Sequence, residues 1–415
     1  MGLHREVRAV RPAVAALAGA AVVNPLVIAR VFADGHFHVV WVSLLLWGLS
    51  GILLAAGIVL AVSARAGQWA AASWTRLALL APSTVVAVVI VELALGSYPR
   101  HSGPRQLKVT NLEYAFDVSL NADSFRDAEF QREKPPDETR VFLIGDSQIY
   151  GNGVPENSTI PQLLQARLRQ ETKAGYRVFN LGVPGASPDQ YARVAQRFAG
   201  YSPDLVLVAL YVDNDLVDRE SAVGWLKQRQ VYRILDRSLN TLLEGCPFPW
   251  VRRFDAEPPY KEAACRGEIN PFLVTRAAVA DNQAYYNSLA RAFDADSHVK
   301  DGLLRIRDLF TGARFGLVLL PSKYQVDAAY FPELRKLGFT LPDSGVIDDV
   351  IQRRIRTWAA ATGIEVLDLL PAARAADARP GVSLYHPVDD HFNVAGNNVV
   401  SDAVYRWIAH GVSFR

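Results

Sequence analysis

Apolar residues are concentrated in the first quarter of the chain. Three stretches there, residues 13–32, 39–62 and 77–97, are almost free of charged side chains. About 20 apolar residues in a helix are enough to cross the hydrocarbon core of a bilayer. The middle stretch carries no charge at all, whereas Glu92 interrupts the third. The pattern therefore predicts a membrane anchor of three transmembrane helices over residues 1–97.

The basic residues around these stretches indicate an orientation. Five arginines lie before the first stretch or between the second and third: Arg5, Arg8, Arg11, Arg65 and Arg76. Four basic residues would lie on the opposite side: Arg30, Arg100, Arg105 and Lys108. The positive-inside rule then favours an internal N-terminus and places residues 98–415 outside the cytoplasmic membrane, by a small margin. A signal peptide is the alternative for the first stretch, but two further apolar stretches follow it.

Beyond residue 97 the pattern changes. Residues 98–138 are polar and mixed, and we interpret them as a linker and lead-in arm. Five short apolar runs follow and are predicted to be strands: Val141–Ile144, Tyr176–Leu181, Leu205–Val212, Phe315–Leu320 and Ile364–Leu369. Helical spacing occurs in four segments: Ile160–Leu168, Asp189–Phe198, Ile347–Ala361 and Val394–Ile408. This alternation predicts an α/β domain over residues 139–415, with a parallel sheet covered on both faces.

Residues 217–310 break the alternation and are predicted to form a mostly helical insertion, clearest over Arg276–Phe293. The only two cysteines of the chain, Cys246 and Cys265, lie in this segment. In an oxidising compartment they would pair and close a loop of about 20 residues, which stabilises by about 3 kcal/mol in the chain-entropy model. Two unrelated buried thiols are the alternative.

Composition excludes several classes of protein. The 415 residues carry 44 basic and 42 acidic side chains, a net charge of +2. This balance excludes a nucleic-acid binder that works through bulk charge and an acidic disordered chain. Two cysteines exclude a disulfide-rich scaffold and any cysteine-based zinc or iron–sulfur module.

Polar residues follow the predicted strands at places suited to chemistry. Ser147 follows the first strand in a Gly-Asp-Ser turn, Gly182 follows the second strand, and Asn214 follows the third. His391 precedes the last helix in an Asp-Asp-His sequence. Ligands bind at the carboxyl ends of strands in open parallel sheets. A serine, a histidine and a carboxylate can form a nucleophilic device, and amide donors can hold an oxyanion.

Taken together, these four blocks resemble the SGNH hydrolase superfamily, or GDSL esterases, over about residues 120–410. The resemblance implies a three-layer α/β/α fold with a five-stranded parallel sheet. It implies that Ser147 is the nucleophile and that His391 is the general base, oriented by Asp389. It also implies an oxyanion hole made by the backbone N–H groups of Ser147 and Gly182 and the side-chain amide of Asn214.

One departure concerns the carboxylate. The widespread family pattern places an Asp three residues before the His, and that position is Val388 here. Asp389, two residues before His391, resembles the variant of envelope-polysaccharide members. Asp390 is the competing candidate, and His386 is a second candidate base. The aspartates on either side of Asn214, Asp213 and Asp215, are interpreted as structural or solvent-facing.

Two further segments are similar to bacterial envelope members. The segment Asn121–Asp127 looks like the arm before the first strand, with Ser-Phe-Arg-Asp replacing the usual Gly-Phe-Arg-Asp. The segment Pro321–Lys323 is loosely similar to one in alginate O-acetylation proteins.

The resemblance implies a serine esterase or O-acyltransferase that acts, through an acyl-enzyme, on O-acyl groups, chiefly acetyl, of an envelope or exported polysaccharide. The expected partners are an acylated glycan or small ester substrate, the lipid bilayer and a membrane acyl-donor protein, and no nucleic acid. The reaction requires no cofactor and no metal. Two alternatives stay open. One is a non-catalytic scaffold or glycan-binding component. The other is a lipid-directed esterase with an apolar groove in the insertion, where Trp225 and Trp250 lie.

Overall fold

The structure is a computed structural model that divides into two compact units. They comprise residues 1–100 with 220–253, and residues 101–219 with 254–415. The described residues are 14, 16–21, 24, 40–62, 105–172, 175–213, 215–216, 236–238, 240–241, 245–248, 251, 256–269, 282–295, 298–337 and 345–410. The second unit holds the predicted α/β domain except for residues 220–253, and it extends that domain at the N-terminal side to include the lead-in arm.

In the first unit, the longest described element is helix α3, Val40–Val62. It coincides with the second predicted membrane span. The third predicted span, 77–97, lies outside the described residues, and the first, 13–32, lies mostly outside them. Across the described residues, no helix has both the length and the apolar character needed to cross a membrane. The prediction of three transmembrane helices is therefore not confirmed.

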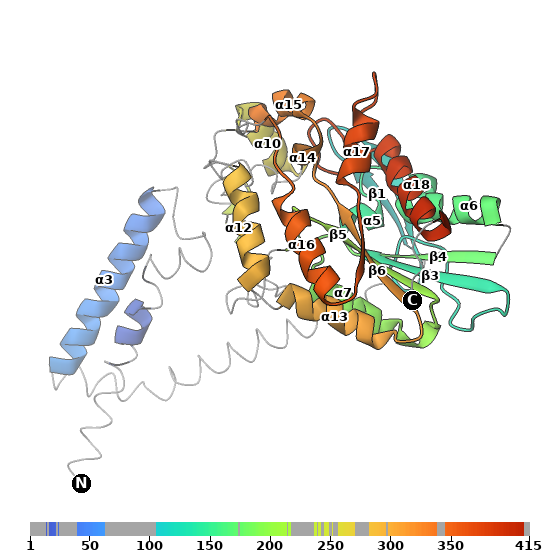
Figure 1. The fold of residues 1–415 in the computed structure, drawn as a ribbon. Coiled ribbons are helices and arrows are strands. Elements are labelled where there is room, and N and C mark those ends of the chain that lie inside the picture. The colour runs from blue at the N-terminus through green and yellow to red at the C-terminus, as the bar shows by residue number, and fades with distance from the viewer. Residues whose placement is uncertain are drawn as a thin grey trace, which may run out of the picture. The chain divides into compact units, whose positions relative to one another are not determined.

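The second unit is built around a five-stranded parallel sheet (Figure 1). Its strands are β3 (Glu138–Gly145), β4 (Gly175–Gly182), β5 (Leu205–Tyr211), β6 (Arg314–Leu320) and β7 (Glu365–Asp368). Their order across the sheet is β4-β3-β5-β6-β7. All seven residues of β5 are buried, as its continuous apolar run predicted for a strand covered on both faces. Each of the five predicted strands is confirmed.

Helices cover both faces of the sheet. The long helices are α6 (Ile160–Thr172), α7 (Pro188–Arg197), α10 (Pro258–Arg266), α12 (Asn282–Ala295), α13 (His298–Leu309), α16 (Val350–Ala361) and α18 (Val394–His410). Shorter ones are α5 (Ser147–Tyr150), α14 (Lys323–Val326), α15 (Phe331–Lys336) and α17 (Leu370–Asp377). Figure 1 shows α6 and α18 together on one side of the sheet and α7 and α13 on the other. The predicted three-layer α/β/α arrangement is confirmed.

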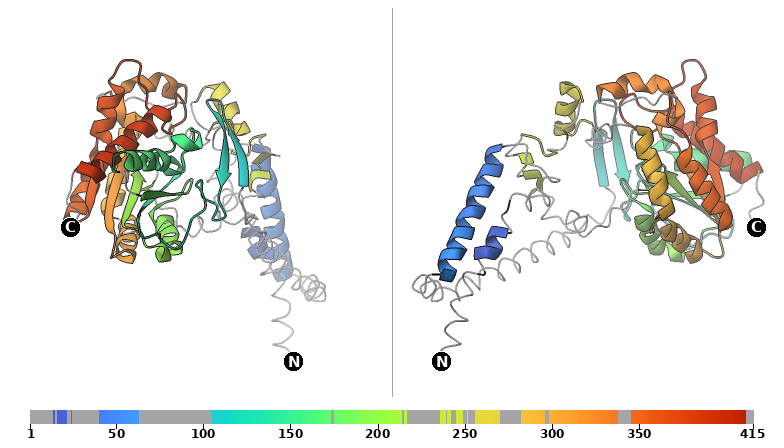
Figure 2. Two further views of the ribbon diagram at one scale, coloured as in Figure 1. Left: turned by 90° about the vertical axis from the view of Figure 1, so that its right-hand side faces the viewer. Right: turned by 60° about the vertical axis from the view of Figure 1, so that its left-hand side comes forward.

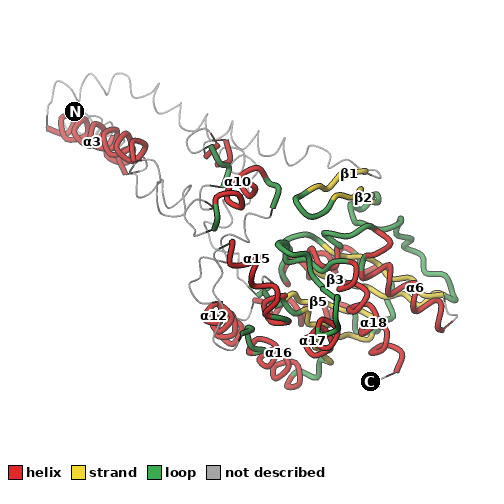
Figure 3. The backbone as a smooth tube through the Cα atoms, turned by 90° about the horizontal axis from the view of Figure 1, so that it is seen from above, coloured by secondary structure: helices red, strands yellow, loops and turns green. Residues whose placement is uncertain are grey.

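The lead-in arm differs from its prediction as a linker. It contains an antiparallel hairpin, with β1 at Arg105–Thr110 and β2 at Ala115–Leu120. Figures 2 and 3 show this hairpin as a pair of strands separate from the five-stranded sheet. Further along the arm, Phe130 stacks on Phe179 of β4 with ring centroids 4.5 Å apart. The arm is therefore a packed part of the α/β unit.

The described part of the insertion is mostly helical and includes α10, α12 and α13, whereas residues 245–248 are not helical. Helix α12 packs against α16, and α13 packs against α7. The segment 220–253 groups with the first unit instead of the α/β unit. Both cysteines, Cys246 and Cys265, are disulfide-bonded, which confirms the predicted bridge.

Candidate active site

Ser147 lies where strand β3 ends and the short helix α5 begins. The preceding residue, Asp146, caps this helix, because its carboxylate accepts a hydrogen bond from the Gln148 N–H at 2.9 Å. The Ser147 side chain is nearly buried, with 7% of its surface exposed. The strand end and the cap thus hold the hydroxyl at the carboxyl edge of the sheet, where the sequence predicted it.

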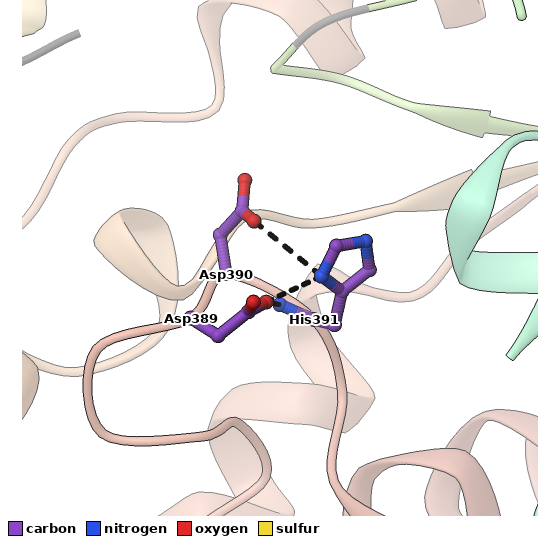
Figure 4. Close-up of side chains that lie close together, drawn as sticks. All are labelled: Asp389, Asp390 and His391. Carbon is purple, nitrogen blue, oxygen red and sulfur yellow. Dashed lines mark hydrogen bonds and ion pairs between the residues drawn. The ribbon is translucent and has the colours of Figure 1, made fainter. Parts of the chain in front are cut away.

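His391 approaches Ser147 from the loop before α18. Its Nε2 lies 2.8 Å from the Ser147 Oγ, which is hydrogen-bonding distance. Its Nδ1 is hydrogen-bonded to the Asp389 carboxylate, and the His391 backbone N–H donates to the same carboxylate oxygen at 2.9 Å (Figure 4). The structure therefore brings together Ser147, His391 and Asp389, the three residues predicted from separated parts of the sequence.

The neighbouring Asp390 is a weaker partner of the imidazole. Its nearest carboxylate oxygen lies 3.7 Å from His391 Nδ1 (Figure 4). The other candidate base, His386, faces elsewhere, because its Nε2 lies 3.1 Å from the Gly153 carbonyl oxygen and its ring packs on Tyr114. Burial lowers the pKa of His386 and favours its neutral form. In this geometry His391 contacts Ser147, and Asp389 is its nearer carboxylate.

The ionisation of the pair follows from its environment. Burial is the largest single influence and would lower the pKa of His391, but the charge and hydrogen bond of Asp389, together with the charges of Asp390 and Asp146, outweigh it and raise that pKa above 6.5. Burial alone would likewise raise the pKa of Asp389, but the imidazole's charge and hydrogen bonds hold it below its usual value. The two groups therefore favour the ion pair that forms when His391 accepts a proton.

Gln148 connects the nucleophile helix to the histidine loop. Its side-chain amide donates to the Asp390 carbonyl at 3.1 Å, and its side-chain oxygen accepts from the Phe392 N–H at 3.1 Å. These two bonds lie on either side of His391 in the chain. Gln148 was not predicted to take part in the site. Its place directly after Ser147 was the only signal in the sequence.

Gly182 ends β4 directly beside Gly145 of β3. A Cβ atom here would lie 2.2 Å from the Tyr150 backbone nitrogen, so only glycine lets α5 pack this closely. The Gly182 N–H donates to the Asn180 side chain at 3.1 Å. It could therefore serve an oxyanion, as predicted, only after that bond breaks.

Asn214, the third predicted oxyanion donor, lies outside the described residues. Its two neighbours are buried and hydrogen-bonded. Asp215 accepts from the Tyr191 hydroxyl at 2.8 Å, and Asp213 accepts from the Tyr286 hydroxyl at 3.1 Å. These contacts agree with a structural role for both aspartates and exclude the solvent-facing alternative.

The Ser-Phe-Arg-Asp segment supports the nucleophile turn. The buried Arg126 donates to the carbonyls of Gly151, at 2.5 Å, and Val154, at 2.8 Å, just after α5. Asp127 accepts from the Asn180 N–H in β4 at 2.9 Å. Ser124 has a φ of 69°, a left-handed conformation that glycine adopts without strain. This explains why glycine is usual at this position in the proteins that the segment resembles.

The hairpin supplies contacts that the sequence did not predict. The Tyr114 hydroxyl donates to the second oxygen of Asp389 at 2.9 Å, and the Asn111 side-chain amide lies 3.5 Å from the same oxygen. These residues occupy the turn between β1 and β2, 275 positions before Asp389 in the case of Tyr114. No local pattern in the lead-in arm signals such a long-range contact.

Asp389, Asp390 and His391 are the one group of three or more potential metal ligands that lie close together among the described residues. Both ring nitrogens of His391 already face hydrogen-bond partners, Ser147 and Asp389. The three side chains therefore fit an acid–base device better than a metal site.

The chain is similar to several solved structures. No protein-family model matches the chain, and no curated protein matches it. A member of the lipolytic G-D-S-L family from Veillonella parvula is 14% identical, with a TM-score of 0.34, over 66% of this chain and 98% of that one. A catalytic mutant of an acetylxylan esterase from Geobacillus stearothermophilus is 14% identical, with a TM-score of 0.34, over 66% and 95%. A two-domain esterase active on acetylated mannans is 11% identical, with a TM-score of 0.33, over 65% and 49%. The solved structures to which this chain is similar thus include a lipolytic protein of the G-D-S-L family, an acetylxylan esterase and an esterase active on acetylated mannans.

Proposed function

We propose that the α/β unit is an SGNH-type serine esterase. The observation that carries this proposal is the chain of contacts from Ser147 through His391 to Asp389, with Oγ and Nε2 2.8 Å apart. A serine hydroxyl is a weak nucleophile unless a base takes its proton. The arrangement supplies that base and a carboxylate that orients it.

The reaction would proceed in two halves. Ser147 Oγ attacks the ester carbonyl while its proton moves to His391 Nε2, and the carbonyl oxygen becomes an oxyanion. The Ser147 N–H and Asn214 are the proposed oxyanion donors, with Gly182 as a third if its bond to Asn180 opens. His391 then returns the proton to the departing alkoxide, which leaves an acyl-enzyme. Water, or a sugar hydroxyl in the case of transfer, then attacks the acyl carbon while its proton moves to His391 Nε2. The bond between the acyl carbon and Ser147 Oγ breaks, His391 returns the proton to Oγ, and the acid or the acylated sugar leaves.

The acyl group is proposed to be small. The sequence resemblance implies an acetyl group carried on a polysaccharide. The lipid-directed esterase, which would have to admit a long acyl chain, is the alternative that a comparison of ester chain lengths tests.

Labelling with a fluorophosphonate probe tests the proposal. The full-length protein in detergent should be labelled, and Ser147→Ala should not. The wild type should also hydrolyse an aryl acetate faster than the corresponding octanoate. A folded wild type that takes no label and hydrolyses neither ester would leave the non-catalytic scaffold as the better explanation. Acetylated glycans and free sugars would then separate hydrolysis from transfer.

We also propose that the enzyme is held at the cytoplasmic membrane with its α/β unit outside. Three apolar stretches in the sequence support this proposal. Large apolar side chains of α3, including Leu44 and Ile52, are exposed, and lipid would shield them from water. The disulfide supports an oxidising compartment. Membrane fractionation, with a reporter fused after residue 415, tests both parts. A soluble protein, or a reporter active only in the cytoplasm, would contradict them.

A further inference from the structure

A buried lysine contacts the loop that carries Asp389. Lys323 begins helix α14, directly after β6, and its side chain is fully buried. Its Nζ lies within hydrogen-bonding distance of four consecutive carbonyl oxygens, those of residues 386–389, at 3.3, 3.1, 2.7 and 2.9 Å. An ammonium group has three N–H donors. The four carbonyl oxygens therefore share the three N–H donors and all point toward the same ammonium group.

A glutamate binds the same loop through its N–H groups. The Glu113 carboxylate accepts from the Val388 N–H at 2.7 Å and from the Asp389 N–H at 2.5 Å. The carbonyl groups of these residues thus meet a positive charge and their N–H groups meet a negative one. Hydrogen bonds to charged groups are the stronger kind. The peptide groups around Asp389 are therefore held both at their carbonyl oxygens, by Lys323, and at their N–H groups, by Glu113.

The glutamate is itself fixed in place. It lies in the hairpin turn, where the Asn111 side chain accepts from the backbone N–H groups of Glu113, at 2.8 Å, and Tyr114, at 2.9 Å. The Leu112 N–H donates to the Glu268 carbonyl at 3.0 Å, which ties the tip of the turn to the end of α10. The turn therefore presents Glu113 and Tyr114 in one conformation toward Asp389.

We propose that Lys323 and Glu113 are positioning residues for Asp389, and we refer to the pair as the loop clamp. Neither touches the reacting atoms. By fixing the peptide groups of residues 386–389, the clamp holds one oxygen of Asp389 against His391 Nδ1, while Tyr114 takes the other. The role in catalysis rests on the proposed function, whereas the effect on the Asp389–His391 contact does not.

Replacing Lys323 separates positioning from a simple effect of charge. Lys323→Met removes a positive charge near His391, which by itself would raise the imidazole pKa. Loss of the Asp389 contact would lower it instead, by about 1 unit or more. The other charged or titratable groups near the pair are unchanged: Asp146, Asp390, Tyr114, Glu113 and His386. We therefore expect the His391 pKa to fall in Lys323→Met. A pKa that rises or stays constant would overturn the proposal.

The pKa is measured by NMR titration of the full-length protein with isotope-labelled histidine, and His391→Gln identifies the signal among the eight histidines. Lys336→Met is the matched control, since Lys336 is half-exposed and pairs with Glu333 on the surface. This control should leave the titration unchanged. The readout requires no activity. If the wild type takes no fluorophosphonate label but the titration shifts as expected, only the proposed function fails.

Glu113→Gln provides a second test if Lys323→Met does not fold. Glu113 bonds the backbone of the loop and not the imidazole, so the loss of its charge alone should weaken the imidazolium of the transition state by less than about tenfold in kcat. Loss of positioning should lower kcat about 10- to 100-fold with little change in KM. Glu262→Gln, at an exposed glutamate of α10, is the control. A kcat within about twofold of the wild type in a folded Glu113→Gln protein would contradict the clamp.

Discussion

At the scale of single residues, the site depends on which of two adjacent aspartates serves the histidine. Asp389 is hydrogen-bonded to Nδ1, whereas Asp390 Oδ1 lies 3.7 Å away. Asp389→Asn should lower kcat by about 10⁴-fold, because the amide no longer holds the imidazole in the required tautomer. Asp390→Asn should lower it by less than about tenfold, since it removes only a weaker electrostatic contact. Steady-state kinetics on an aryl acetate measure both effects. A larger loss of kcat in Asp390→Asn than in Asp389→Asn would reverse the assignment.

The raised pKa of His391 gives a pH dependence. General-base catalysis requires neutral imidazole, so activity is lost as the pH falls through the pKa of the folded protein. The negative charge of Asp389 raises that pKa despite burial. The acid limb of kcat/KM should therefore have its midpoint above pH 6.5, and residual activity in Asp389→Asn should have its midpoint at lower pH. A wild-type midpoint below 6.5 would show that Asp389 does not govern the imidazole.

At the scale of elements, helix α5 and strand β4 are packed backbone to backbone. A Cβ on Gly182 would meet the backbone at Tyr150 and Ile149 at 2.2 and 2.7 Å, and backbone cannot rotate away. Gly182→Ala should therefore lower the free energy of unfolding by about 1–3 kcal/mol or more. It should also displace the turn that carries Ser147 and reduce activity.

Denaturant unfolding and ester hydrolysis measure these two effects. Gly312→Ala is a suitable control, because a Cβ there has no atom within 4 Å. Equal stability of the two variants would mean that α5 can move away from β4.

The elements also show how far the sequence alone could lead. The strands were predictable because burial on both faces requires continuous apolar runs, as in β5. The hairpin was not, because β2 buries only Val118 and its pattern carries little apolar signal. Ser147, His391 and Asp389 could be located because each lies beside a strand end or a helix start. Lys323 could not, since lysine is normally exposed and its carbonyl partners lie 63 to 66 residues later.

At the scale of the whole molecule, the disulfide restricts the unfolded chain. Cys246 and Cys265 close a loop of about 20 residues, for which the chain-entropy model gives about 3 kcal/mol. Cys246→Ser with Cys265→Ser should lower the melting temperature, and so should a reductant applied to the wild type. The reductant should leave the melting temperature of the double variant unchanged. A wild type insensitive to reductant would show that the bridge does not limit unfolding.

The contact between the hairpin and Asp389 also determines when the site can assemble during translation. The Tyr114 hydroxyl and the Asp389 carboxylate that it contacts are 275 residues apart. A ribosome that adds about 5–20 residues per second needs some tens of seconds to cover that interval. Throughout it, the growing chain has its serine and its hairpin but lacks the carboxylate and the base. On the proposed function, nascent chains should therefore be inert toward esters until the segment with Asp389 and His391 has been made and has reached Ser147.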